Sequence, residues 1–206
     1  MVITLEDKEL FQEIEKHLLE DKKPSVYLNN LLSKGDFDKM PFKLIKDLKS
    51  AEQNKKHHPE GDVFIHTMMV VDKGATVRDK ATSKREFMWA LLLHDLGKPK
   101  TTRYIGKKLV SYDHDKLGEQ LSKEFLSYFT SDQKFILNVS KLVRYHMHLI
   151  FIIKNLPFTD FEGLKKYVNI NDIALVFYSD RLGRGGVTEK DKQTVLKEIE
   201  SFKSRT

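Results

Sequence analysis

The chain of 206 residues contains no cysteine. This absence excludes disulfide bonds and thiolate metal sites, so any metal ion must be held by histidines and carboxylates. The longest apolar runs are far too short to span a bilayer, and the start Met1-Val2-Ile3-Thr4 does not form a signal peptide. We therefore expect a cytoplasmic protein with no membrane partner.

Internal repeats, low-complexity segments and clear linkers are also lacking. Charged residues make up 32% of the chain and apolar residues 40%, which favours a largely helical protein with solvated outer faces. The formal net charge of +6 permits RNA, nucleotide or other phosphate partners without demonstrating them.

The most distinctive stretch is a long apolar run that ends in a histidine and an aspartate. Residues 87–93 are all apolar, His94 and Asp95 follow them, and Gly97 and Pro99 come next. Because glycine and proline are typical just past a helix end, this order predicts a buried helix that ends at the His-Asp pair. An acid placed there costs stability unless it binds something. For the dipeptide alone, a helix end at which His94 interacts with the helix dipole is an equal alternative.

Two further predicted helices carry a polar residue on an apolar face. His66 lies three residues after Val63, and Asp180 lies seven residues after Ile173 and four after Val176. An unpaired ionised carboxylate on a buried stripe would be costly, so Asp180 needs a metal ion, a cation or a proton. A histidine such as His66, taken alone, is more often a core residue with satisfied hydrogen bonds.

Other helices are predicted at about 4–19, 24–32, 116–129, 132–143 and 188–202, with a loop at 155–160 and a hairpin at 103–112. His57 and His58 precede a turn, and we expect a surface role for them, the alternative being that one of them contacts the substrate. The N-terminal helices are rich in lysine, which indicates either solvated helix faces or an RNA-binding surface. These lysines are Lys22, Lys23, Lys43, Lys46, Lys49, Lys55 and Lys56.

The segment His94-Asp95-Leu96-Gly97-Lys98, together with His66 and Asp180, resembles the HD superfamily of metal-dependent phosphohydrolases. More narrowly, the segments 58–67 and 94–102 are similar to the HD domain of bacterial tRNA nucleotidyltransferases. The resemblance implies an all-α HD-domain helical bundle with a small β-hairpin after the His-Asp motif. It also implies one domain over residues 1–206, with an N-terminal helical extension at 1–53 and the HD core at 54–184.

The polymerase head of those tRNA nucleotidyltransferases has no counterpart here, because no Gly-Ser pair occurs in the chain. The paired aspartates Asp36 and Asp38 lack the surrounding strand of such a head. We therefore expect a free-standing HD protein to which the CCA-adding activity does not transfer, whereas the hydrolytic activity of the HD domain does.

The predicted metal ligands are His66, His94, Asp95 and Asp180. Two imidazoles and two carboxylates suit a divalent transition-metal ion, namely Mn²⁺, Fe²⁺, Co²⁺, Ni²⁺ or Zn²⁺, but not Ca²⁺. Such an ion polarises a phosphoryl oxygen and lowers the pKa of bound water. Asp95 is the residue that we expect to act both as ligand and as proton acceptor from water.

His114 and His146 occur singly, without the adjacent His-His pair of relatives that hold two ions. We expect them to line the pocket or to complete a second, weaker metal site. Lys98 is predicted to neutralise a substrate phosphate, the alternative being a solvated lysine. Weaker candidates for phosphate contacts are Arg144, Arg181 and Arg184.

The sequence thus predicts a metal-dependent phosphohydrolase, a phosphomonoesterase or 2′,3′-cyclic phosphodiesterase, with a phosphorylated small molecule, a nucleotide or an RNA end as partner. The alternative is a non-catalytic RNA- or nucleotide-binding module with a vestigial metal site. The intact ligand set favours the enzyme.

Overall fold

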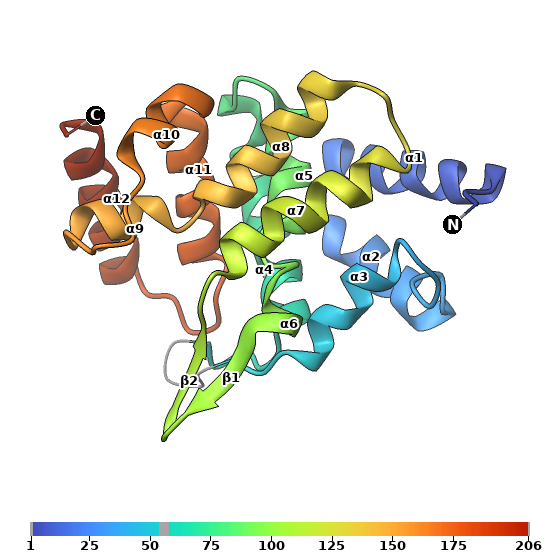
Figure 1. Ribbon diagram of the computed structural model, residues 1–206, viewed down its shortest axis with the longest axis horizontal. Helices are drawn as coiled ribbons and strands as arrows, with labels where there is room; N and C mark the ends of the chain where they lie inside the picture. The colour runs from blue at the N-terminus through green and yellow to red at the C-terminus, as the bar shows by residue number, and fades with distance from the viewer. Residues whose placement is uncertain (1, 54–57, 206) are drawn as a thin grey trace.

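The computed structural model describes residues 2–53 and 58–205 and consists mostly of α-helices with one small hairpin (Figure 1). The expected start of the HD core at residue 54, together with Lys55, Lys56 and His57, lies outside the described residues. The elements in chain order are α1 (Leu5–Glu20), α2 (Pro24–Lys34), α3 (Lys43–Lys46), the 3₁₀ helix η1 (Asp47–Ser50), α4 (Val63–Ala75), the 3₁₀ helix η2 (Arg78–Lys80), α5 (Lys84–Leu93), α6 (Lys98–Thr101), β1 (Thr102–Ile105), β2 (Lys108–Ser111), α7 (His114–Ser127), α8 (Gln133–Tyr145), α9 (His148–Ile153), α10 (Phe161–Tyr167), α11 (Ile170–Leu182) and α12 (Glu189–Lys203).

Helix α5 forms the centre of the bundle. Ser83 caps it by accepting a hydrogen bond from the Glu86 backbone N–H, and the seven residues from Phe87 to Leu93 are fully buried. A helix that is apolar on all sides must be covered on all sides, and α1, α4, α8 and α11 pack against this one. Helix α5 ends at Leu93, so the predicted buried helix before the His-Asp pair is confirmed.

Two glycines allow the elements around the site to approach closely. A Cβ at Gly97 would lie 2.1 Å from the His114 carbonyl oxygen, where α7 begins. A Cβ at Gly183 would lie 2.6 Å from the Val70 Cα, where α11 ends against α4. Since real Cβ atoms do not approach other atoms so closely, glycine is required at both contacts. The first contact brings the start of α7 next to the His-Asp turn, and the second brings the end of α11 against α4, which carries His66.

The N-terminal helices share the core of the rest of the chain. Phe11 of α1 stacks on Trp89 of α5 at 4.4 Å between ring centroids and on Phe129 at 4.6 Å. The Trp89 indole N–H donates to the Glu15 carboxylate at 2.8 Å. The expected division into an extension at 1–53 and a core at 54–184 therefore does not separate two sets of buried side chains.

The all-α bundle with a hairpin is confirmed, and the differences from the predicted elements are local. Helices α9 and α10 were not expected, and α7 begins two residues before the predicted start at 116. The stretch Gln133–Ile153, which comprises α8 and α9, is long and apolar enough to cross a membrane by length and composition. Because 56% of that window is buried and α8 packs against α5 and α7, the bundle core accounts for its composition.

Candidate metal centre

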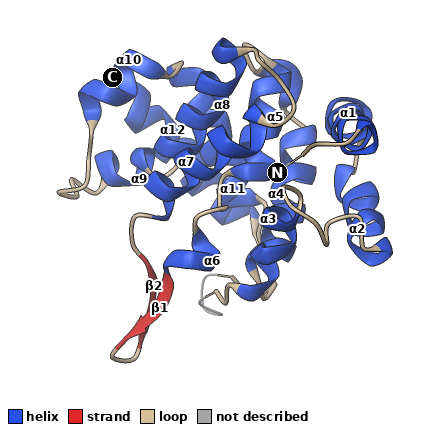
Figure 2. Cartoon of the chain, turned by 45° about the vertical axis from the view of Figure 1, so that its right-hand side comes forward, coloured by secondary structure: helices blue, strands red, loops and turns tan. Residues whose placement is uncertain are grey.

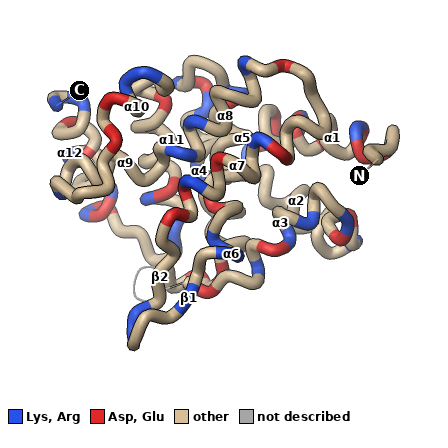
Figure 3. Tube along the Cα trace, viewed as in Figure 1, with Lys and Arg blue, Asp and Glu red and all other residues tan. Residues whose placement is uncertain are grey.

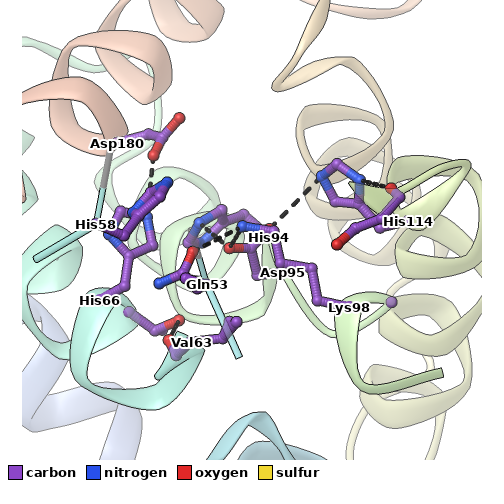
Figure 4. Close-up of polar contacts among 12 residues, drawn as sticks. Gln53, His58, Val63, His66, His94, Asp95, Lys98, His114 and Asp180 are labelled. Atoms are coloured by element: carbon purple, nitrogen blue, oxygen red, sulfur yellow. Dashed lines mark hydrogen bonds and ion pairs between the residues drawn. The ribbon is translucent and has the colours of Figure 1, made fainter. Parts of the chain in front are cut away.

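His94 and Asp95 lie in the turn after α5, each 1% exposed (Figure 4). The His94 Nδ1–H donates to the Leu91 carbonyl at 2.8 Å, which directs Nε2 toward Asp95 Oδ2 at 3.1 Å. Burial raises the pKa of Asp95, but His94 and Lys98 beside it hold that pKa well below its usual range. The turn thus presents an ionised carboxylate and an imidazole nitrogen to one point.

A first group of donor atoms combines this turn with α4. The side chains of His66, His94 and Asp95 offer ligand atoms that all lie within 4.8 Å of one another. Asp180, from α11, lies beside this group, with its Oδ1 3.0 Å from His66 Nε2 and 3.1 Å from Arg184 Nη2. The structure therefore brings the four predicted ligands together.

A second group of donor atoms lies on the other side of Asp95. Nε2 of His114 and Nε2 of His146 are 3.2 Å apart and lie 3.6 and 3.8 Å from Asp95 Oδ1. Their Nδ1–H groups donate to the Ser111 and Val143 carbonyls at 2.7 and 2.6 Å. Because both rings are oriented by backbone carbonyls, as His94 is, their Nε2 atoms are directed at the shared carboxylate. The geometry is that of two three-residue groups joined by Asp95.

Three polar atoms at this junction lack hydrogen-bond partners among the described residues: His94 Nε2 and both carboxylate oxygens of Asp95. Lys98 Nζ lies 2.7 Å from Asp95 Oδ2, an ion pair without hydrogen-bond geometry, and also donates to the Gln53 side chain. Buried polar atoms without partners are rare, and a cation satisfies all three at once. The nitrogen and oxygen donors fit a divalent transition-metal ion.

Glu60 was not predicted as part of the site, and His58 was expected at the surface, with a substrate contact as the alternative. Glu60 Oε1 accepts from His66 Nδ1 and from His58 Nδ1, both at 3.0 Å, and its Oε2 accepts from the Gly185 backbone N–H at 3.1 Å. Burial raises the pKa of Glu60, but these hydrogen bonds, led by the one from His66, lower it to about 2. An ionised carboxylate behind a ligand histidine fixes its ring and tautomer.

A cavity of about 380 Å³ opens beside the two groups. It is lined by four cationic side chains, of which Lys98, Arg181 and Arg184 were predicted phosphate contacts and Lys154 was not. Arg144 is placed elsewhere: its guanidinium pairs with Asp115 and lies 3.9 Å from Glu119. The remaining lining residues are Glu52, Gln53, His58, Leu109, Ser111, His146, Met147, Ile150, Phe177 and Asp180.

Residues 63–184, more than half of the chain, match the sequence model of the HD domain. The chain belongs to the HD domain family. This family consists generally of metal-dependent hydrolases, which confirms the family-level prediction of a metal-dependent phosphohydrolase.

The HD domain is also similar to proteins named multifunctional CCA protein. The one from Haemophilus influenzae (strain PittGG) is 27% identical over 185 residues, which cover 84% of this chain and 43% of that protein. The one from Pasteurella multocida (strain Pm70) is 27% identical over 186 residues, which cover 87% and 43%. The predicted relation to CCA enzymes is therefore confirmed, and the chain spans less than half the length of these relatives.

Proposed function

We propose that this HD domain hydrolyses phosphate esters of nucleotides or RNA ends, as a phosphomonoesterase or a 2′,3′-cyclic phosphodiesterase, in the cytoplasm and as a single domain over residues 1–206. The observation that carries the proposal is the buried carboxylate of Asp95, shared by two histidine pairs, beside a cationic cavity that His146 and Asp180 help to line. The names of the CCA relatives, which refer to the end of tRNA, support nucleotides or RNA ends as the substrate class.

The proposed ligands form two sets. His66, His94 and Asp95, with Asp180 beside them, would hold one divalent ion, and Asp95, His114 and His146 would hold a second, weaker one. When bound, the metal polarises a phosphoryl oxygen and lowers the pKa of a bound water. The absence of an adjacent His-His pair does not separate His114 from His146, because α7 and the end of α8 bring them together.

The protein's own groups have distinct proposed roles around the phosphate. Asp95, with its lowered pKa, remains ionised as a ligand and is a correspondingly weak proton acceptor. The Lys98 ammonium neutralises phosphate charge at the edge of the cavity as a point charge. Arg181 and Arg184, which also line the cavity, would contact the remaining phosphate oxygens.

The test is hydrolysis of bis(p-nitrophenyl) phosphate and of adenosine 2′,3′-cyclic phosphate with added Mn²⁺, Co²⁺ or Ni²⁺. The parent should hydrolyse at least one of these substrates, Asp95→Ala should not, and Asp113→Ala, a change at an exposed aspartate on the neighbouring turn, should match the parent. A metal-loaded parent without activity on either substrate would favour the alternative of a binding module.

A further inference from the structure

The hairpin β1–β2 projects from the helical bundle (Figures 1 and 2). Leu109 and Ser111 of β2 line the cavity, so the hairpin forms part of its wall. Large side chains are nevertheless left exposed on its strands: Tyr104 is 64% exposed and Ile105 50%. Such exposure beside a catalytic pocket indicates a contact surface.

The strand register places Tyr104 on the cavity side of the hairpin. Thr102 pairs with Ser111 and Tyr104 with Leu109, and cross-strand partners lie on the same face of a sheet. The Thr102 and Ser111 hydroxyls are 2.7 Å apart, as expected for a shared face. Because Leu109 and Ser111 line the cavity, the Tyr104 ring lies at its rim.

The position of this ring is fixed by a hydrogen bond. The Tyr104 hydroxyl donates to the Glu52 carboxylate at 3.2 Å, and Glu52 also lines the cavity. A ring that is anchored at its hydroxyl and still 64% exposed offers an aromatic surface to a planar partner. Every nucleobase has such a planar face.

The hairpin also carries positive charge only. Residues 102–111 include Arg103, Lys107 and Lys108, all exposed, and no acidic residue. Figure 3 shows lysine positions at the tip of the hairpin. Lys107 lies in the turn, while Arg103 and Lys108 lie on the face away from the cavity, so a strand that contacts them has to pass around the two-stranded ribbon.

We propose that the hairpin binds the single-stranded segment of an RNA that precedes the terminal phosphate in the cavity. Tyr104 stacks on a base near the end, and Arg103, Lys107 and Lys108 contact backbone phosphates, the combination by which proteins hold single strands. This proposal rests on the proposed function and selects RNA ends over free nucleotides as its substrates.

The lysine-rich N-terminal helices are weaker candidates for the RNA-binding surface. Lys43 pairs with Asp47 and Lys46 with Asp38, so part of their charge is neutralised within the protein. Among the described residues, Arg103, Lys107 and Lys108 form no ion pair, although the same holds for Lys22, Lys23 and Lys49 of the N-terminal region. The hairpin also adjoins the cavity, where the terminal phosphate is bound.

Direct binding tests the role of the ring. A labelled single-stranded RNA of about ten nucleotides, ending in a 3′-hydroxyl so that it is not hydrolysed, is titrated with metal-loaded protein and followed by fluorescence anisotropy. Tyr104→Ala should raise the Kd by about 5- to 150-fold. Tyr104→Phe, which keeps the ring but loses the hydrogen bond to Glu52, should raise it less. Tyr112→Ala, which removes an exposed tyrosine just outside the hairpin strands, is the matched control and should have little effect. Equal weakening by Tyr104→Ala and Tyr112→Ala would overturn the proposal.

The salt dependence of the same titration tests the cations. Replacing Arg103, Lys107 and Lys108 together by alanine should reduce the slope of log K against log salt concentration by about 2, as expected for three lost phosphate contacts to a single strand. The control triple Lys22→Ala, Lys23→Ala and Lys49→Ala should leave the slope as in the parent. If the N-terminal triple variant reduced the slope and the hairpin triple variant did not, the RNA would bind to the N-terminal helices and the proposal would be contradicted.

Hydrolysis separates this proposal from the proposed function. For the parent and Tyr104→Ala, the kcat/KM for an RNA oligonucleotide with a 2′,3′-cyclic phosphate end is divided by that for bis(p-nitrophenyl) phosphate. The ratio should fall by about 5- to 150-fold in the variant. An unchanged ratio would refute the hairpin proposal while the hydrolase stands. A parent that hydrolyses neither substrate would refute the hydrolase, and the anisotropy result would still decide RNA binding.

Discussion

The carboxylate of Glu60 offers the most specific prediction about how the metal centre is held. It accepts hydrogen bonds from His66 Nδ1 and His58 Nδ1 at 3.0 Å, and its side chain is only 3% exposed. Glu60→Gln keeps the size and one oxygen acceptor but removes the charge. The amide N–H₂ group of the glutamine then faces either the two histidine N–H groups or the Gly185 N–H. Because these groups are also donors, no hydrogen bond forms on that side.

The expected effect is on metal affinity. Replacing the carboxylate partner of a ligand histidine typically weakens metal binding by about 10- to 100-fold. This loss corresponds to about 1.4–2.7 kcal/mol of binding free energy. The His66 ring loses the negative partner that keeps its proton on Nδ1 and its Nε2 lone pair toward the site. Glu60→Ala should bind the metal at least as weakly as Glu60→Gln, because the His66 ring then also loses the contact that fixes its orientation.

Competition between apo-protein and a chromogenic chelator for Co²⁺ or Mn²⁺ measures this affinity directly. Glu15→Gln is the matched control, because Glu15 is another partly buried glutamate with two donors, Arg85 and Trp89, and it lies away from the centre. Glu15→Gln should lower thermal stability and leave the metal affinity as in the parent. If Glu60→Gln also binds the metal as the parent does, the role assigned to Glu60 is refuted.

Three further changes have defined outcomes. Lys98→Ala should retain the metal and lower kcat/KM by about ten- to a thousandfold, and Lys98→Arg should recover only part of the loss in a steady-state assay. Phe11→Ala should lower the free energy of unfolding in urea by about 3–5 kcal/mol, because it removes the ring between Trp89 and Phe129. Burial raises the pKa of Glu119, but hydrogen bonds from lysines lower it overall, so its stabilising effect is present above pH 4.5 and is lost as the pH falls below that value. Glu119→Gln should therefore flatten the acid side of the curve of Tm against pH, recorded with chelator present, and an unchanged curve would contradict this reasoning.

Several features could be predicted because their signals are local. The run before His94 is apolar throughout, and a helix in that position has to be buried. His66 and Asp180 are polar residues on apolar stripes, and Asp180 was predicted to need a metal ion, a cation or a proton. In the structure they lie 3.0 Å apart although 114 residues separate them in the chain. The burial pattern alone indicated that Asp180 needs a partner, and the family resemblance placed His66 and Asp180 in the same predicted ligand set.

Other features depend on tertiary contacts that periodicity does not encode. Glu60 lies in a turn, so no repeating pattern predicts where its carboxylate points. Arg144 was assigned to phosphate, but α7 packs against α8 and supplies Asp115 and Glu119 to it. Helices α9 and α10 have only 6 and 7 residues, too few for a helical period to stand out from neighbouring apolar residues.

The metal content of variants tests the shared role of Asp95 most directly. After reconstitution with Mn²⁺ or Co²⁺ and removal of unbound ions, the metal content is measured by inductively coupled plasma mass spectrometry for the parent, Asp95→Ala and His114→Ala. The parent should retain metal, His114→Ala should lose only the more weakly bound ion, and Asp95→Ala should retain none. An Asp95→Ala protein that is folded and carries as much metal as the parent would contradict the account.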